Sequence, residues 1–262
     1  MIARFPALVL VLVLSFGVLL DVPPAAADDE ACDNLISLPG TRTTTFTISS
    51  PGIYCLDTDV IMAASFTAGN AIEIAANYVT LNLKGHKVHG AAAGAGTQAN
   101  GIHAVNRRNV TVKNGTVWGF FTGILLDANP QSHATLTGYL VEGIRAELNR
   151  FVGIQVVGAN SIVRRNVVAN TGPTQSQPFS IGILLASSGG RVLDNDVLTV
   201  TGSGGVGNGI GIGGPNTLIA GNRITSTDSG LVVGFSSGKY RDNLTAGVGT
   251  PYSGGTDAGG NN

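Results

Sequence analysis

Two residues of complementary chemistry, Glu73 and His103, occupy the same position in successive copies of a short unit. The unit reads small–Ile–x–apolar, as in Ala71-Ile72-Glu73-Ile74 and Gly101-Ile102-His103-Ala104. If the two copies form neighbouring strands, these side chains lie within contact distance. A carboxylate beside an imidazole can act as a general base, and Asp127 follows the next copy and can reach the same face. The sequence predicts Glu73, His103 and Asp127 as catalytic candidates, with a surface ion pair of little energetic worth as the alternative.

Three further residues are candidates for holding a ligand. Gln155 takes the position of Glu73 in a later copy of the unit. Trp118 lies in an aromatic cluster with Phe120 and Phe121, and an exposed cluster of this kind can stack on sugar rings. Arg164 can bind a sugar carboxylate. The alternatives are an aromatic cluster packed under a loop and an arginine solvated in a turn.

Other chemistries find less support. The close pair Asp194 and Asp196 flanks a predicted bend, and we interpret it as a solvated turn rather than as the paired acids of a glycoside hydrolase. No grouping of carboxylates with Arg or Lys suits a calcium-dependent lyase, and the Gly-rich residues 202–214 lack the strand-to-helix context of a phosphate loop. A net charge of −1 provides no basic footprint for nucleic acid. The sequence predicts no cofactor, no metal site and no nucleic-acid partner.

The small–apolar unit recurs along most of the chain. From Gly101 on, its copies follow one another at steps of 21 to 30 residues. The copies begin at Ala71, Gly101, Gly123, Gly153, Gly182, Gly209 and Gly230. A second unit, apolar-x-x-Asn, follows the later copies and supplies Asn166, Asn195, Asn222 and Asn243.

These units predict an all-β, right-handed parallel β-helix of about seven coils. Each short run alternates apolar and polar residues, so one face is buried. Three such strands make one coil, and coils must stack to bury a continuous core. We expect the recurrent Asn at a tight bend, in a left-handed conformation and bonded to the Asn of the next coil. We expect the recurrent Gly where the chain turns into a strand. A leucine-rich repeat would need an L-x-x-L-x-L frame, and an antiparallel sandwich would show hairpin spacing.

Three early segments carry a resemblance to a known family. They are GIYCL at residues 52–56, AIEI at 71–74 and NYVTLNLKGHKV at 77–88. They resemble the N-terminal coils of bacterial secreted parallel β-helix repeat proteins of the pectin lyase-like superfamily. The resemblance covers nearly all of the chain after residue 27 and is specific for the fold. The superfamily contains pectate lyases, polygalacturonases, alginate-modifying enzymes, phage tailspikes, adhesins and members without known activity.

The resemblance implies where a site would lie. Enzymes of the superfamily carry catalytic groups on the outer face of one sheet, which the small–apolar units would build here. Alternation along the strands then predicts one outward row. Its members are Glu73, His103, Leu125, Gln155, Leu184, Gly211 and Val232. From the third member on, the row has one amide and no ionisable group, which is a poor surface for acid–base chemistry.

The two ends of the chain have their own signals. Residues 1–27 begin with a basic segment, continue with an apolar run and end in Ala25-Ala26-Ala27, which is typical of a secretory signal peptide. We therefore expect an extracellular or periplasmic protein without membrane association after cleavage. Residues 28–70 are predicted to be an N-terminal cap and residues 71–246 the β-helix. The Gly/Ser/Asn-rich residues 247–262 are predicted to be a loose C-terminal tail.

Cysteine usage agrees with export. Cys32 and Cys55 are the two cysteines of the chain, and in an oxidising compartment they are predicted to form one disulfide. Two free buried thiols are the alternative.

Three functions follow from these features, in order of preference. The first is binding of an extracellular or cell-surface polysaccharide, indicated by the polar Thr/Ser/Asn surface, the export signal and the resemblance. The second is a noncatalytic structural or adhesive surface module. The third is a polysaccharide lyase or glycoside hydrolase that uses Glu73, His103 and Asp127. Likeness of fold alone is a weak guide among them.

Overall fold

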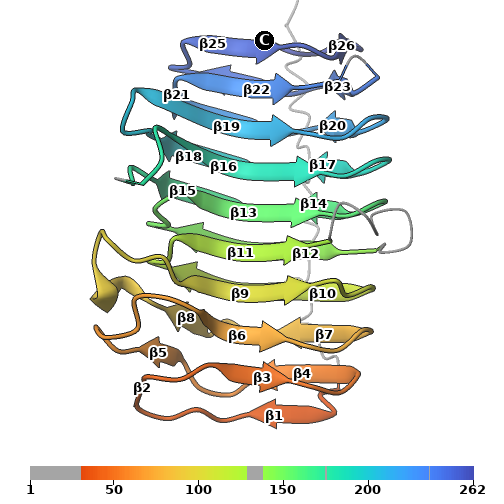
Figure 1. Cartoon of the computed structure of the whole chain (residues 1–262). Helices are drawn as coiled ribbons and strands as arrows, with labels where there is room; N and C mark the ends of the chain where they lie inside the picture. Colours follow the sequence, from red (N-terminus) through yellow and green to blue (C-terminus); the bar gives the residue numbers. More distant parts are fainter. Residues whose placement is uncertain (1–30, 129–137, 175, 236) are drawn as a thin grey trace, which may run out of the picture. The chain divides into compact units, whose positions relative to one another are not determined.

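The computed structural model describes residues 31–128, 138–174, 176–235 and 237–262. The chain from Cys32 to Asn262 forms one compact unit built almost entirely of β-strands, with one short 3₁₀ helix, η1 (Ala91–Ala93). The strands stack in parallel from coil to coil, as Figure 1 shows. The predicted parallel β-helix is therefore confirmed. Within the described residues, no helix has the length and apolar character needed to span a membrane.

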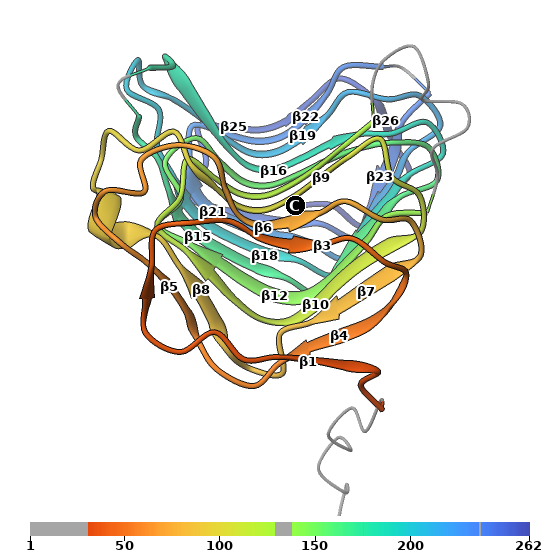
Figure 2. The ribbon, with the colours of Figure 1, turned by 60° about the horizontal axis from the view of Figure 1, so that its bottom comes forward.

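Two parallel sheets make up the coil. The nine-stranded sheet forms one side, and its strands dip in their middle (Figure 2). Its strands are β3 (Phe46–Ile48), β6 (Asn70–Ile74), β9 (Asn100–Val105), β11 (Thr122–Asp127), β13 (Val152–Val157), β16 (Phe179–Ala186), β19 (Val206–Ile212), β22 (Ser229–Val233) and β25 (Thr250–Ser253).

The seventeen-stranded sheet forms the other two sides, as two runs of strands. The first run contains β1 (Asn34–Ile36), β4 (Gly52–Leu56), β7 (Val79–Asn82), β10 (Val110–Trp118), β12 (Leu140–Glu147), β14 (Ile162–Arg164), β17 (Arg191–Leu193), β20 (Leu218–Ala220), β23 (Lys239–Arg241) and β26 (Thr256–Asp257). The second run adds β2 (Thr41–Arg42), β5 (Val60–Met62), β8 (Lys87–His89), β15 (Val167–Thr171), β18 (Asp196–Val200), β21 (Arg223–Thr227) and β24 (Leu244–Ala246). The long strands β10 and β12 pair with both runs and join them into one sheet.

The solenoid extends beyond both predicted ends. The seven predicted copies coincide with β6 to β22 of the nine-stranded sheet, but β3 and β25 add a strand at each end. Residues 28–70, predicted to be a cap, already contain β1 to β5, which pair in parallel with later coils. The expectation of a loose tail at residues 247–262 is wrong, because β25 and β26 pair with β22 and β23.

The recurrent glycines are required by space. A Cβ atom at Gly101 would lie 2.5 Å from Cγ1 of Val117, and one at Gly182 would lie 2.6 Å from Cγ1 of Val197. Neither glycine has a positive φ. The expectation that the recurrent glycine lies where the chain turns into a strand is wrong for these two, because Gly101 lies within β9 and Gly182 within β16. The sheets approach so closely here that any side chain would enter the packed core.

The recurrent asparagines form a buried ladder from coil to coil. The Nδ2 of Asn166 donates to Oδ1 of Asn195 at 3.0 Å, and that of Asn195 donates to Oδ1 of Asn222 at 2.9 Å. The series continues from Asn222 to Asn243 at 2.9 Å and from Asn243 to Asn261 at 3.1 Å. Asn261 lies in the segment that was predicted to be loose.

The left-handed conformation falls on the residue before each of these asparagines. Arg165, Asp194 and Asp242 each have a φ of 54°, and Gly221 has a φ of 68°. The expectation that the ladder residue itself is left-handed is wrong. The preceding residue makes the bend, and the next side chain is then directed into the coil, where it replaces backbone partners that the bend removes.

The predicted disulfide is confirmed. Cys32 and Cys55 are bonded, with a Cα–Cα distance of 5.8 Å, and they lie 23 residues apart in sequence. In β1, Leu35 is the strand partner of Cys55, so the bond ties the first coil to the second.

Removing this bond is expected to destabilise the N-terminal coils. A crosslink that closes a loop of this length contributes about 3 kcal/mol by restricting the unfolded chain. The Cys32→Ser, Cys55→Ser double variant should therefore unfold at a lower urea concentration than the oxidised protein. Reduced wild-type protein serves as the control and should unfold like the variant. An unchanged urea midpoint in both would contradict the prediction.

Candidate functional site

The strand register of the nine-stranded sheet confirms the predicted outward row. Glu73 pairs with His103, His103 with Leu125, and the series continues without a slip. We call this series the central row, and the structure extends it by one residue at each end. Its members are Thr47, Glu73, His103, Leu125, Gln155, Leu184, Gly211, Val232 and Ser253.

A second row lies beside the central row on the same outer face. A Cβ at Gly123 would lie 2.6 Å from Nδ2 of the buried residue Asn149, so the position of Gly123 faces inward. The residue before it, Thr122, therefore faces outward. We call the residues before the recurrent small position the upstream row. Its members are Asn70, Asn100, Thr122, Val152, Ile181, Asn208, Ser229 and Thr250. We refer to the two rows together as the outer face.

Four polar residues form one hydrogen-bonded network at the N-terminal end of this face. His103 Nδ1 lies 2.6 Å from Oε2 of Glu73, and their side chains are 17% and 21% exposed. Asn70 Nδ2 donates to the same Glu73 oxygen at 2.8 Å, and Asn100 Nδ2 donates to Asn70 Oδ1 at 2.9 Å. We call Asn70, Glu73, Asn100 and His103 the polar network.

The network determines which imidazole nitrogen is available. A carboxylate only accepts, so the Nδ1 that faces Glu73 carries the hydrogen. Asn70 Nδ2 lies 3.1 Å from the same Nδ1, and the two nitrogens share the Glu73 oxygen as acceptor. In the neutral ring, Nε2 is then the acceptor that can bind a hydroxyl or take a proton.

The other candidates from the central strands lie further along. Asp127 is the strand partner of Val105. It lies two residues after Leu125, which is the strand partner of His103. It is on the same side of the strand as Leu125. Gln155 lies on the central row between Leu125 and Leu184.

The middle of the outer face is apolar. Phe121 and Phe151 stack with ring centroids 5.0 Å apart, and Phe151 meets Phe179 at 5.4 Å. We call these three half-buried rings, which lie outside the hydrophobic core, the aromatic row. Next to them, Val152 and Ile181 of the upstream row are buried but do not belong to the main hydrophobic cluster inside the coil. The outer face therefore carries an apolar layer of its own beside the polar network.

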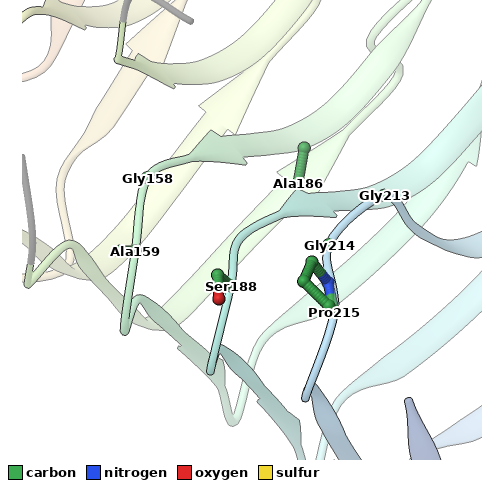
Figure 3. Close-up of a pocket in the computed structure, with 7 residues that line it drawn as sticks. All are labelled: Gly158, Ala159, Ala186, Ser188, Gly213, Gly214 and Pro215. Carbon is green, nitrogen blue, oxygen red and sulfur yellow. The ribbon is translucent and has the colours of Figure 1, made fainter. Parts of the chain in front are cut away.

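A hollow of about 400 Å³ adjoins this face, at the ends of β13, β16 and β19. Figure 3 shows that it is formed where the chain leaves three stacked strands, with Ala186 and Pro215 among its walls. Ala186 follows Leu184 of the central row by two residues, so the hollow continues the outer face. Its lining consists of Gly158, Ala159, Ala186, Ser188, Gly213, Gly214 and Pro215.

Trp118 lies away from this site, on the seventeen-stranded sheet. Its ring stacks on His89 at a centroid distance of 4.3 Å and an interplanar angle of 7°. The predicted aromatic cluster is divided, because Phe120 is in the core and Phe121 belongs to the aromatic row. Burial lowers the pKa of His89, and the nearby charge of Lys87 lowers it further.

This lowered pKa has a measurable consequence. In the unfolded chain His89 takes up a proton near pH 6.5, whereas in the fold it does so only at a lower pH. The unfolded state therefore binds more protons below pH 6.5, and the free energy of unfolding should fall as the pH drops through that range. The melting temperature of a His89→Gln variant should depend less on pH between 6.5 and 5, because the titrating ring is gone. His86→Gln is the control, and an equal flattening in it would contradict the assignment.

Arg164 also lies on the other sheet. Its Nε donates to Oε2 of Glu142 at 2.6 Å, and Arg165 Nη2 donates to Oε1 of the same carboxylate at 2.9 Å. In a similar way Arg223 forms a two-bonded pair with Asp196, which was predicted to be a solvated turn residue. These three arginines are paired with acids, and none of them shares a face with Gln155.

The structure brings together Glu73 and His103, and it adds Asn70 and Asn100, which the sequence reading missed. The signal was available, since both asparagines directly precede the recurrent small residue. In the described ranges, no three residues among His, Cys, Asp and Glu gather as a metal site.

The comparisons with known proteins concern the fold. No family model matches the sequence, and no curated protein sequence matches it. The chain is similar to the crystal structure of the Dettilon tailspike protein, with a TM-score of 0.53 and 13% identity over 87% of this chain. The match spans 60% of the length of the tailspike chain. At this identity the likeness shows a shared parallel β-helix and nothing further.

Proposed function

We propose that this protein binds a polysaccharide along the outer face of its nine-stranded sheet. One observation carries the proposal: the polar network lies on the same face as an apolar layer and an adjoining hollow. Sugars need this combination, because hydroxyl groups pair with amides and carboxylates while the carbon faces of the rings pack on apolar side chains. A straight stack of coils offers such groups at a regular spacing of about 4.8 Å, which suits a chain of repeating units.

The test is affinity electrophoresis of the protein in gels that contain soluble polysaccharides from plants, algae and bacterial surfaces. The wild-type protein is expected to be retarded by at least one polymer. The Glu73→Gln, His103→Gln double variant should bind about tenfold more weakly, equivalent to about 1.4 kcal/mol, because two hydrogen-bonding groups of the network change. Glu142→Gln is the matched control, since it alters a bonded carboxylate on the other sheet. Equal loss in the control, or no retardation by any polymer, contradicts the proposal.

The short contact between Glu73 and His103 also favours a second candidate function. A carboxylate that accepts from an imidazole orients the ring, so that Nε2 can remove or deliver a proton. Such a pair would serve a polysaccharide lyase or glycoside hydrolase. The test is a search for new unsaturated or reducing ends in each bound polymer. Ends that form with wild type and vanish in the Glu73→Ala, His103→Ala variant establish catalysis, and their absence with wild type excludes it for that polymer.

We also propose that the protein is exported and belongs to the pectin lyase-like superfamily. The parallel β-helix and the disulfide support this assignment. The predicted signal peptide, residues 1–27, lies outside the described residues. Mass spectrometry of the protein exported by its producer is expected to place the first residue at Asp28. An N-terminus at Met1 would contradict it.

A further inference from the structure

The charges of the outer face limit the kind of polymer that it can hold. In the central and upstream rows, every position is described, and none is Lys or Arg. The ionisable members of these rows are Glu73 and His103. The residues that line the hollow are also uncharged. Recognition by these rows therefore depends on amides, hydroxyls, the carboxylate of Glu73 and apolar contacts. Asp127, on the same side of β11, adds a second carboxylate beside them.

Three arginines on the side of the seventeen-stranded sheet are paired with acids. Arg164 and Arg165 are paired with Glu142, and Arg145 is paired with Glu147 at 2.8 Å. All three pair with acids away from the outer face, and Arg164 and Arg165 share one carboxylate.

One cation does lie next to the face. Arg150 directly precedes Phe151 of the aromatic row, and its Nε is buried without a hydrogen-bond partner within the described residues. It stands at the edge of one coil only. At this edge, a polymer with a negative group on every sugar would meet Arg150, and further along it would meet the carboxylate of Glu73.

From these charges we infer that the face takes a neutral polysaccharide, made of hexoses or N-acetylhexosamines without uronate, sulfate or phosphate groups. This inference rests on the proposed function. Anionic groups brought onto the face would lose water without gaining ion pairs, and those near Glu73 would be repelled. Neutral hydroxyl and acetamido groups can instead bond to Asn70, Asn100, Gln155 and Asn208. The acetamido methyl group also suits the apolar layer and the small-residue hollow.

The experiment compares two sets of polymers with the same protein. The neutral set is dextran, galactomannan and soluble chitin oligosaccharides. The anionic set is polygalacturonate, alginate and hyaluronan. Each is tested at low and at physiological salt with the wild type, the Glu73→Gln, His103→Gln variant and Arg150→Gln. The expected result is binding within the neutral set that changes less than twofold with salt, falls about tenfold in the double variant and is retained in Arg150→Gln.

Two other results would overturn the inference: one leaves the proposed polysaccharide binding intact, and the other removes it. Binding of an anionic polymer that weakens steeply with salt and is lost in Arg150→Gln would show a polyanion site at the edge, so the polysaccharide function would stand and its neutral class would fall. Absence of binding in both sets would overturn the function and the inference together.

Discussion

Replacing Asn195 with alanine is expected to lower the free energy of unfolding by about 2–6 kcal/mol. The Oδ1 of Asn195 accepts from both the backbone N–H and the Nδ2 of Asn166, each at 3.0 Å. Its Nδ2 donates to Asn222 and to the carbonyl oxygen of Val163. The variant leaves the backbone N–H of Asn166 and one of its two Nδ2 hydrogens buried without an acceptor, while the other Nδ2 hydrogen keeps the carbonyl oxygen of Val141. Each hydrogen-bonding group left without a partner costs about 1–3 kcal/mol. The measurement is the urea midpoint followed by circular dichroism.

Asn261→Ala is the matched control for this prediction. Asn261 ends the same ladder, and its Oδ1 accepts from the backbone and side chain of Asn243 in the same way. It is half-buried at the open end of the solenoid, where water can replace the lost acceptor. We expect a loss of less than about 1 kcal/mol there. Equal losses at the two positions would show that the ladder bonds do not act through burial.

The fold was predictable because the repeated unit marks the same point of every coil. When the isoleucines of successive units, such as Ile102 and Ile124, are aligned, the strands of the nine-stranded sheet come into register. The outward row then follows from the alternation of side chains along each strand. The terminal coils were missed because they lack the unit: β3 reads Phe-Thr-Ile and β25 reads Thr-Pro-Tyr-Ser. A terminal strand packs against one neighbour only, so it tolerates residues that an inner coil excludes.

The candidate site was predictable in part for a related reason. Glu73 and His103 came from simple alternation, which holds along the second half of each strand. Asn70 and Asn100 escaped because alternation breaks at the intervening small residue, which faces inward like the isoleucine after it. Ala71 is fully buried, and a Cβ at Gly101 would lie 2.5 Å from Val117. Residues three apart, such as Asn70 and Glu73, then lie on one face. A sequence pattern with a period of two residues cannot reveal such a pair, because the interruption of the alternation depends on how the two sheets pack.

The same packing gives the second large effect, at Gly209. A Cβ atom there would lie 2.5 Å from Cγ2 of Ile224 and 2.8 Å from the carbonyl oxygen of Gly230. Ile224 is fully buried and Gly230 begins the next coil, so neither can move without disturbing the core. Gly209→Ala is therefore expected to lower the free energy of unfolding by about 1–3 kcal/mol, the usual cost of overpacking.

Gly211 provides the control within the same strand, because β19 contains both glycines. Its Cβ would point outward and lie 3.4 Å from Cδ1 of Leu184, an ordinary contact distance. Gly211→Ala should be neutral or stabilise by about 0.4–1 kcal/mol, since alanine restricts the unfolded chain. Urea midpoints of the two variants, compared with wild type, separate the effect of space from the loss of glycine itself. If both variants lost stability equally, the close approach of the sheets would not be the reason for the recurrent glycine. The conclusion that the position before each isoleucine faces inward would then be wrong as well.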